Sequence, residues 1–495
     1  MSVNSATTSA KGGKRIAQDK GRSSAVLGNE FQNTSSPKGG REGGSSPIAW
    51  KFVRLGDIAQ TTSGGTPRRD KPHYYGGTIP WVKSGELGDR VVYETSEALT
   101  EEGLASSNAK IFPKGTLCIA LYGATVGKLG ILGIDAATNQ AVCAVFPTDE
   151  LDTRYLYRFF EGKRRELIEQ GKGGAQSNIS QGIIRDTILP VPPLDEQRRI
   201  VAEIEKQFTR LDAGVAALRR VQANLKRYRA AVLKAACEGR LVPTEAELAK
   251  SENRKERFES GEALLTRILT ERRKNWMGRG QYKAPSAPDT NMLDPLPEGW
   301  VWASVGQVAN VALGKMLDKT KHHKGRKLPY LRNINVRWGQ VDIGNLLEMF
   351  FDDDELERFG VRAGDVLVCE GGEPGRAAVW DGRVEGVMYQ KAIHRLRFFG
   401  NIQARYLVFI LEFLAKTGRL EHWFTGSTIK HFTRESFVSL PIPLPPLAEQ
   451  TRIVVEVERR LSVVEELDTM VSANLQRAAG LRQSILQKAF TGGLV

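Results

Sequence analysis

Two segments of the sequence concentrate side chains that are suited to binding an anion. The first, SGGTPRRDKPHYYGGTIPWVKSGEL, begins at Ser63, and the second runs from Lys315 to Arg337 with Asp318 as its only acidic residue. Lysine and arginine attract phosphate without regard to base sequence, and Arg, Asn and Gln can form paired hydrogen bonds to guanine and adenine edges. These residue types predict binding of nucleic acid. The alternative is a pair of basic loops that are merely solvated.

The two basic segments occupy matching positions in two parts of the chain, which makes merely solvated loops less plausible. A third candidate is the polar segment around Asn178, which the segment around His431 matches before a later Pro-Pro pair. Glycines ahead of Asn178 let a backbone approach a duplex closely. The predicted DNA contacts are Arg68, Arg69, Lys71, Tyr75, Lys83, Lys128, Lys172, Gln176, Ser177, Asn178, Lys319, Lys321, Lys324, Arg326, Lys327, Arg332, Asn333, Arg337, Thr428, Lys430 and His431.

Motifs that would carry catalysis are incomplete. Gly123–Lys128 is one residue short of a phosphate-binding GxxxxGK loop, and Leu129 stands where a magnesium-binding hydroxyl is required. The Glu161-Gly162-Lys163 triplet resembles a nuclease motif but lies in a predicted helix of solvated charges. The acidic run 352–355 is typical of a helix N-terminus. The six histidines lack metal-ligand spacing. We therefore expect no catalytic and no metal-binding residues.

Composition sets looser limits. The chain has 495 residues and 71 Lys and Arg against 57 Asp and Glu, a net charge of +14 that agrees with a polyanionic partner without requiring one. Four scattered cysteines predict neither a disulfide framework nor a zinc site, and favour the cytoplasm. We expect no membrane span, because no run of about 18 apolar residues occurs. Residues 1–49 are rich in Gly, Ser, Lys and Arg and predict a disordered basic arm.

An internal repeat organises the remaining chain. LPVPPLDEQRRIVAEIE begins at Leu189, and IPLPPLAEQTRIVVEVE begins at Ile442, 253 residues later. Short apolar runs and glycine-rich turns precede both segments, which predicts an α+β domain over residues 50–190 and another over 300–443. Short helices are expected near 154–169 and 405–421. The chain is therefore predicted to be two copies of one unit, each a globular domain followed by a helix.

The two predicted helices begin after the Pro-Pro pairs and carry apolar residues at alternating spacings of three and four. Polar residues interrupt this seam at Gln222, Arg229, Asp468 and Arg482, where we expect them to set register. About 43 residues make a rod of roughly 60–65 Å. An antiparallel coiled coil around a pseudo-twofold axis is favoured; parallel pairing, or two ordinary core helices, remain alternatives.

Several of these motifs resemble the DNA-specificity subunit of type I restriction–modification systems. GGTPRRDKPHYYGGTIPWVKSGEL is similar to the opening of the family's first domain, and PPLDEQRRIV, PPLAEQTRIV and AFTGGLV are similar to its paired helices. The stretch from LVPTEAEL to LPEGWVWA resembles its central linker. The resemblance covers Trp50 to Val495. The opening of the second domain, VALGKMLDKTKHHKGRKLPYLR, departs more, as expected if the two domains read different sequences.

The resemblance implies a non-catalytic subunit whose two target-recognition domains each read one half of a bipartite site in double-stranded DNA. It implies two modification subunits, which use S-adenosylmethionine to methylate adenine N6, and motor-nuclease restriction subunits that use ATP and magnesium; this chain would hold no cofactor. A fused nuclease or methyltransferase and a sequence-nonspecific coiled-coil scaffold are the alternatives. The predicted segments are 1–49 (arm), 50–190 (first domain), 191–242 (central helix), 243–299 (helical or extended linker), 300–443 (second domain) and 444–495 (C-terminal helix).

Overall fold

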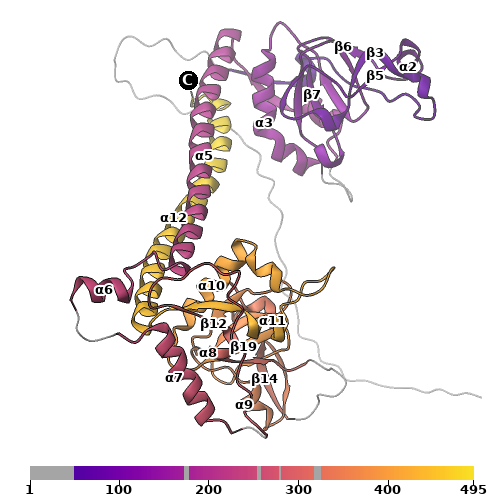
Figure 1. Cartoon of the computed structure of the whole chain (residues 1–495). Helices are drawn as coiled ribbons and strands as arrows, with labels where there is room; N and C mark the ends of the chain where they lie inside the picture. The colour runs from indigo at the N-terminus through magenta and orange to yellow at the C-terminus, as the bar shows by residue number, and fades with distance from the viewer. Residues whose placement is uncertain (1–49, 172–177, 254–257, 278–279, 317–324, 495) are drawn as a thin grey trace, which may run out of the picture. The chain divides into compact units, whose positions relative to one another are not determined.

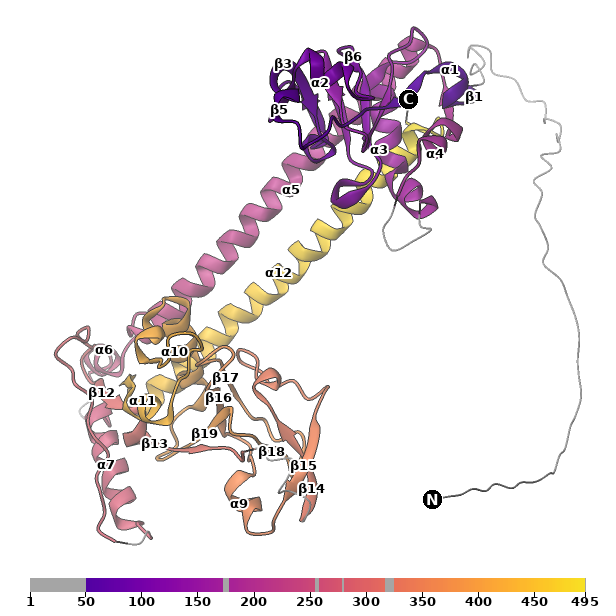
Figure 2. The ribbon, with the colours of Figure 1, turned by 90° about the vertical axis from the view of Figure 1, so that its right-hand side faces the viewer.

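Three small sheets and one long helix build the first domain (Figures 1 and 2). The structure is a computed structural model that describes residues 50–171, 178–253, 258–277, 280–316 and 325–494, so the predicted arm lies outside it. The elements are β1 (Lys51–Arg54), α1 (Leu55–Ile58), β2 (Thr61–Ser63), β3 (Tyr75–Val82), β4 (Arg90–Val92), β5 (Glu97–Leu99), α2 (Glu101–Ala105), β6 (Ile111–Phe112), β7 (Leu117–Ala120), β8 (Leu129–Leu132), β9 (Ala136–Thr138), β10 (Val142–Val145), α3 (Thr153–Gln170), α4 (Gln181–Asp186) and β11 (Ile188–Val191).

The core of the first domain lies where α3 packs on the sheet β2-β10-β7-β8-β4. Every residue of β7 and β10 is buried, as expected for continuous apolar runs covered on both faces. Asp152 begins α3 by accepting hydrogen bonds from the backbone of Arg154 and Tyr155. A second sheet has the order β5-β3-β9-β6, and β1 pairs with β11 in antiparallel register. The first and last strands of the domain are therefore hydrogen-bonded to each other.

The second domain repeats this plan. Its elements are β12 (Val301–Ser304), α8 (Val305–Val308), β13 (Ala309–Leu313), β14 (Arg326–Leu331), β15 (Leu347–Phe351), α9 (Glu355–Phe359), β16 (Val366–Cys369), β17 (Ala377–Val379), β18 (Met388–Tyr389), β19 (Ile393–Phe398), α10 (Ala404–Lys416), α11 (Arg434–Ser439) and β20 (Pro441–Leu444). The order β13-β19-β16-β17 matches β2-β10-β7-β8, and β12 pairs with β20 as β1 does with β11. The predicted α+β repeat is confirmed.

One predicted helix is shorter than expected. The prediction near 405–421 extends past the observed end of α10 at Lys416. Gly418 follows with a φ of 73°, and residues 419–423 form a separate 3-10 turn. A glycine adopts this left-handed conformation at little cost, and it ends the α-helical path.

Helices α5 (Leu194–Cys237) and α12 (Leu447–Ala489) lie side by side along their length (Figures 1 and 2). Three polar contacts join the helices: Arg482 donates to Asp212, Gln222 donates to Asp468 and Arg229 donates to Glu465. Residue numbers rise along α5 from contact to contact while they fall along α12, so the two helices are antiparallel. All four polar interruptions of the seam are members of these contacts. The predicted antiparallel coiled coil is confirmed and parallel pairing is excluded, whereas the register role of these residues stays a prediction.

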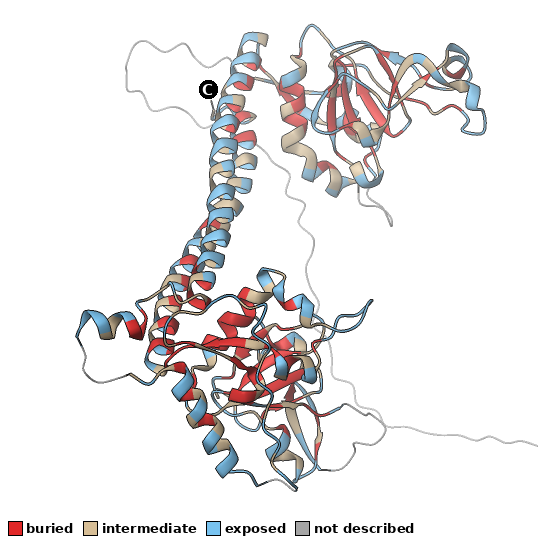
Figure 3. Ribbon diagram, viewed as in Figure 1, coloured by how far each residue is buried: buried red, intermediate tan, exposed pale blue. Residues whose placement is uncertain are grey.

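Burial along the coiled coil is uneven (Figure 3). Val201, Ile204 and Phe208 are buried near the start of α5, whereas the seam residues Val215 and Leu218 are only half-buried. Two helices alone cannot enclose a seam residue on every side; near the helix ends, α3 and α10 add a third surface. The middle of the pair therefore depends on polar contacts as well as on apolar burial.

Two equivalent buried glutamines attach the domains to the helices. Gln197 of α5 donates to the carbonyls of Glu150 and Pro192 and accepts from the Asp152 amide at 2.8 Å. Gln450 of α12 donates to the Pro445 carbonyl and accepts from the Gln403 amide at 3.1 Å. Both side-chain amides form hydrogen bonds with buried backbone atoms that would otherwise have no partner. The glutamine of each PPLxEQ motif thus joins the start of a long helix to the segment that precedes α3 or α10.

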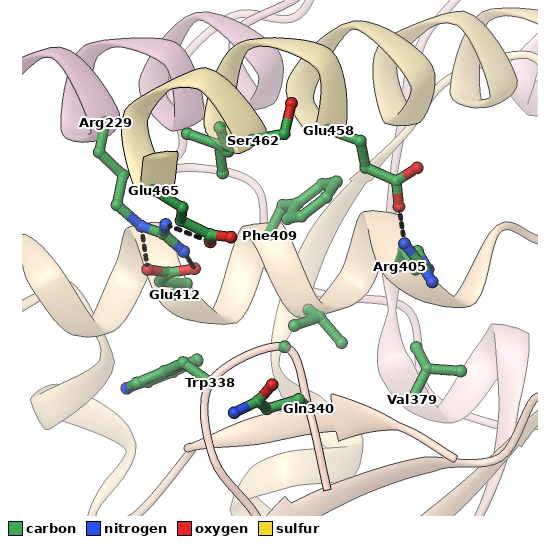
Figure 4. A pocket seen from close by; sticks show the side chains of 13 residues that line it. Arg229, Trp338, Gln340, Val379, Arg405, Phe409, Glu412, Glu458, Ser462 and Glu465 are labelled. Atoms are coloured by element: carbon green, nitrogen blue, oxygen red, sulfur yellow. Dashed lines mark hydrogen bonds and ion pairs between the residues drawn. The ribbon is translucent and has the colours of Figure 1, made fainter. Parts of the chain in front are cut away.

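An arginine completes each attachment, as Figure 4 shows for the second domain. Arg229 of α5 makes two hydrogen bonds, of 2.8 and 3.0 Å, to Glu412 of α10, whose side chain is 4% exposed. Burial lowers the pKa of Arg229, and its bonds to Glu412 and Glu465 more than offset this and raise it. In the first domain, Arg482 of α12 lies 3.6 Å from Glu161 of α3. Glu161 is therefore a structural ion-pair partner, and the expectation that it is a solvated helix charge is wrong.

The segment between the domains contains α6 (Glu245–Ser251) and α7 (Gly261–Lys274). Leu264 and Ile268 of α7 are fully buried in the core of the second domain. Glu449 of α12 accepts hydrogen bonds from the Trp300 indole at 2.9 Å and from the Glu245 amide at 3.1 Å. Burial raises the pKa of this carboxyl group. Much of the linker is thus packed against the second domain and the start of α12.

Candidate nucleic-acid interface

Three loops meet in the first domain beyond the carboxyl end of β7. The turn Ser84–Glu86 contacts the turn Gly123–Thr125, and Tyr122 forms a β-bridge with Asn178. The amide of Ile179 also donates to the Leu121 carbonyl at 2.7 Å. Predicted contacts from three distant parts of the sequence, Lys83, Lys128 and Asn178, therefore lie on neighbouring loops. Lys128 and Asn178 are exposed, as contact with DNA requires.

The second domain brings together the equivalent loops. The side chain of Asn333 donates to the Gly371 carbonyl at 3.3 Å, which joins the turn 333–335 to the loop after β16. The amide of Phe432 donates to the Glu370 carbonyl at 2.8 Å, which adds the loop Thr425–His431. Each contact has its counterpart in the first domain. We call these two sets the three-loop surfaces: 83–86, 121–128 and 178–180 in the first domain, and 332–335, 370–376 and 425–432 in the second.

The basic opening segment of the first domain is held mainly by internal contacts. Added Cβ atoms at Gly64 and Gly65 would lie 2.0 and 2.2 Å from neighbouring backbone, so this segment packs where only glycine fits. The Arg69 guanidinium stacks over Tyr75 and Trp81, 4.7 and 5.0 Å from the ring centroids. The Tyr75 hydroxyl donates to the Pro67 carbonyl at 2.6 Å.

Glu97 is shared by two of the predicted DNA contacts, Lys83 and Arg69. Both cations lie 2.6 Å from its carboxylate, and their hydrogen bonds lower its pKa. Arg68 pairs with Asp70, and these two side chains are 72% and 60% exposed. Lys71 is exposed as well. Arg69 is also exposed, with 55% of its side chain accessible, whereas Lys83 is half-buried, so Lys83 is less well placed for an external anion than Arg68, Arg69 and Lys71.

The predicted contacts of the second domain divide in a similar way. Arg326 and Lys327 on β14 pair with Asp353 and Glu348 across β15. Arg332 donates to the Asn345 carbonyl at 3.1 Å. The predicted contacts whose side chains are exposed are Arg326, Lys327, Arg337, Thr428, Lys430 and His431, the first two despite their ion pairs. The predicted contacts that lie outside the described residues are Lys172, Gln176, Ser177, Lys319, Lys321 and Lys324.

Sequence reasoning missed Arg376, the counterpart of Lys128. Gly123-Ala-Thr-Val-Gly127-Lys128 corresponds to Gly371-Gly-Glu-Pro-Gly375-Arg376, and Gly127 and Gly375 both have positive φ. Arg376 donates to the Asn333 carbonyl at 2.8 Å and so ties two loops of its surface together. Extending the repeat to this glycine-rich turn would have found it.

A buried histidine supports the second three-loop surface. His394 is fully buried on β19, with Nε2 2.6 Å from the Phe432 carbonyl. Burial lowers its pKa to about 4.

Acidification should therefore destabilise the second domain. The unfolded state takes up a proton near pH 6.5, whereas the folded state resists it down to about pH 4, so stability falls as the pH drops through this window. We expect a loss of about 2 kcal/mol between pH 7 and pH 5 from this group. Urea unfolding at the two pH values, compared with His394→Leu, measures it. An equal pH dependence in the variant would contradict the assignment.

Within the described residues, no helix is long and apolar enough to cross a membrane, and no cluster of three or more His, Cys, Asp or Glu is arranged to hold a metal.

The comparisons with known proteins agree with the duplicated plan. The family model for the type I restriction modification DNA specificity domain matches residues 47–216 and again 297–461. The chain belongs to this specificity-domain family. Each match includes one three-loop surface and the beginning of one long helix, so the chain carries two copies of the specificity domain.

Relatives of the specificity family match different lengths of the chain. The EcoDI specificity subunit of Escherichia coli is 23% identical over 470 residues, covering 91% of this chain and 90% of that protein. The EcoR124I/EcoR124II specificity subunit of Escherichia coli is 27% identical, but the match covers only 37% of this chain and 46% of the relative. A solved structure from work on complex assembly and conformational transition of the type I R-M system has a TM-score of 0.62 at 20% identity, covering 91% of this chain and all of that one. The shared fold therefore extends over both specificity domains and the helices.

Proposed function

We propose that this specificity subunit is a non-catalytic reader of double-stranded DNA, in which each specificity domain recognises one half of a bipartite site. The observation that carries this proposal is the equivalent three-loop surface in both domains, each domain being attached to a different end of one antiparallel helix pair. Exposed Lys128, Lys430 and Arg337 suit phosphate or guanine, and Asn178 suits adenine. The two surfaces differ in these side chains, so the half-sites would differ.

Partner subunits would supply the chemistry. We propose that two modification subunits methylate adenine N6 with S-adenosylmethionine, and that motor-nuclease subunits use ATP and magnesium for restriction, in the cytoplasm. Exposed apolar residues on one face of α12 support docking of partner helices: Val463, Leu467, Met470 and Leu481 are 49, 41, 55 and 51% exposed. Their spacing places them on one stripe, and such stripes usually mark an interface.

Methylome mapping tests the function. The subunit is expressed with its modification partners in a host without such a system, and N6-methyladenine is located across the genome. A split motif with two defined halves is expected, and exchange of residues 50–190 should change one half only. Equal binding of random and selected duplexes at one salt concentration would instead favour a nonspecific scaffold. Methyl transfer by the isolated chain would favour a fused enzyme.

Lys128 should contribute to affinity through phosphate contact. Lys128→Ala is expected to weaken binding of the assembled complex by roughly 1 kcal/mol and to reduce the salt-dependence slope by about one. Titrations at several salt concentrations measure both. Lys114→Ala is the matched control, because Lys114 is exposed near the opposite end of β7. The same loss in both variants would show that overall charge, and not the three-loop surface, is responsible.

A further inference from the structure

An apolar groove lies at equivalent places in both specificity domains. In the first domain its cavity measures about 450 Å³ and is formed by β1, β11, α3 and the end of α12. Phe159, Leu486 and Phe490 line it, with the Phe159 and Phe490 rings 5.3 Å apart. Phe52 and Ile188 stand beside them, 67% and 58% exposed. Phe52 and Ile188 lie on the paired strands β1 and β11, so they extend the apolar lining of the groove to its exposed rim.

The corresponding groove of the second domain contains the matching positions. Trp302 on β12 takes the place of Phe52, Pro441 that of Ile188, Ile410 that of Phe159 and Cys237 that of Phe490. The strand pairing agrees, because Phe52 is opposite Pro190 and Trp302 is opposite Pro443. The two grooves are therefore related by the internal repeat.

The second groove is partly covered by the chain itself, which leaves a cavity of about 350 Å³. Residues 292–296, Met-Leu-Asp-Pro-Leu, line it, and Leu293 and Leu296 are half-buried there. Leu296 packs against the core of the second domain. The Trp302 indole donates to the Asp294 carbonyl at 3.2 Å, and Arg419 pairs with the Asp294 carboxylate at 3.3 Å. The covering segment turns at Met292 and Leu293, where the Leu293 amide donates to the Thr290 carbonyl at 3.1 Å, and it carries two leucines three residues apart.

The residues that precede the first domain differ from the segment that covers the second groove. Residues 292–296 come just ahead of β12, and the residues at the same distance ahead of β1 are Glu-Gly-Gly-Ser-Ser, 42–46. These residues have no apolar side chain with which to fill the groove. Residues 42–46 therefore offer Phe52 and Ile188 no counterpart of Leu293 and Leu296.

We infer that the groove formed by Phe52, Phe159, Ile188, Leu486 and Phe490 docks a short segment of a partner subunit, with leucine-sized side chains three residues apart. This inference rests on the proposed function only in placing the partner within the restriction–modification complex. In the second domain, a segment of the chain itself already takes part of this place. The two ends of the helix pair therefore present different surfaces to the partner subunits, although the domains share one fold.

The chain's own covering segment is a probe for the groove. A fluorescent peptide with the sequence of residues 290–298, TNMLDPLPE, is titrated with the full-length subunit, and anisotropy is recorded. One saturable site is expected, because the tethered segment competes with the peptide for the second groove at high effective concentration. Phe52→Asp and Ile188→Asp should each weaken binding by about tenfold or more. These side chains are exposed, so folding should be unaffected.

Two controls make the test decisive. Tyr93→Asp changes an equally exposed aromatic residue of the same domain, 67% exposed and outside the groove, and should bind the peptide normally. A peptide with both leucines replaced by aspartate should not bind. Binding that is insensitive to Phe52→Asp, or no stronger than that of the aspartate peptide, would overturn the inference.

Photo-crosslinking identifies the natural occupant. With Phe52→p-benzoylphenylalanine in the assembled complex, we expect a crosslink to a partner segment that has two leucine-sized residues three positions apart. A crosslink to this chain, or none to any partner, would overturn the inference. Neither result would alter the split methylation motif, so failure here is distinct from failure of the proposed function.

Discussion

Replacing Arg229 by leucine is expected to destabilise the second specificity domain by about 3–5 kcal/mol, because it leaves the Glu412 carboxylate buried without its partner. Glu412 is 4% exposed and receives both of its hydrogen bonds from this guanidinium. Leucine restores neither the charge nor the donors. Urea unfolding followed by tryptophan fluorescence measures the loss, since most tryptophans of the chain lie in this domain.

Two further variants separate the buried pair from general charge effects. Lys226→Leu removes an exposed cation from the same helix and should change stability by less than about 0.5 kcal/mol. The double variant Arg229→Leu with Glu412→Leu should recover most of the lost stability, because two apolar side chains replace a buried ion pair well. If the double variant were as unstable as Arg229→Leu alone, the unpaired Glu412 charge would not be the cause.

Removing one heptad from each long helix is expected to shorten the gap between the two recognised half-sites by about 3 base pairs. Residues 214–220 of α5 and 472–478 of α12 lie between the Asp212–Arg482 and Gln222–Asp468 contacts, so deleting both segments keeps every polar register contact. Seven residues correspond to about 10.5 Å of helix, and duplex DNA rises about 3.4 Å per base pair. Methylome mapping of the reconstituted complex gives the new spacing.

The half-site sequences should not change, because both three-loop surfaces remain intact. Affinity for the original spacing should fall toward the nonspecific level, roughly 10³-fold or more. Deletion of residues 214–220 alone is the control: it breaks the register of the helix pair and should abolish the split motif altogether. An unchanged spacing with altered half-sites would refute the idea that the helices set the gap.

The duplicated plan was predictable because repeats and apolar spacing are local properties of a sequence. The 253-residue repeat correctly predicts equivalent domains, and the polar interruptions at Gln222, Arg229, Asp468 and Arg482 take part in contacts between the helices. The sequence favoured antiparallel helices without excluding parallel ones, because a parallel pair would bury a similar apolar seam. The polar contacts that decide it join residues more than 230 positions apart.

Side-chain roles at the candidate interface were less predictable. Arg69 and Lys83 look like free cations in the sequence, yet Glu97, which belongs to another strand, pairs with both. Arg376 was overlooked, and the structure shows that it connects two loops by donating to the Asn333 carbonyl. A residue's charge is local information, but its availability to DNA depends on which distant group it meets after folding.

By itself, the sequence determined the α+β class, the two copies, the long helices and the resemblance to the specificity family. Each of these follows from residue type and spacing, which act over a few turns of chain. Only the tertiary structure decided which loops meet at each three-loop surface, which cations stay exposed, and which of two equivalent grooves is partly covered. Those features depend on contacts between distant segments, such as Leu296 and the core of the second domain, which spacing along the chain does not encode.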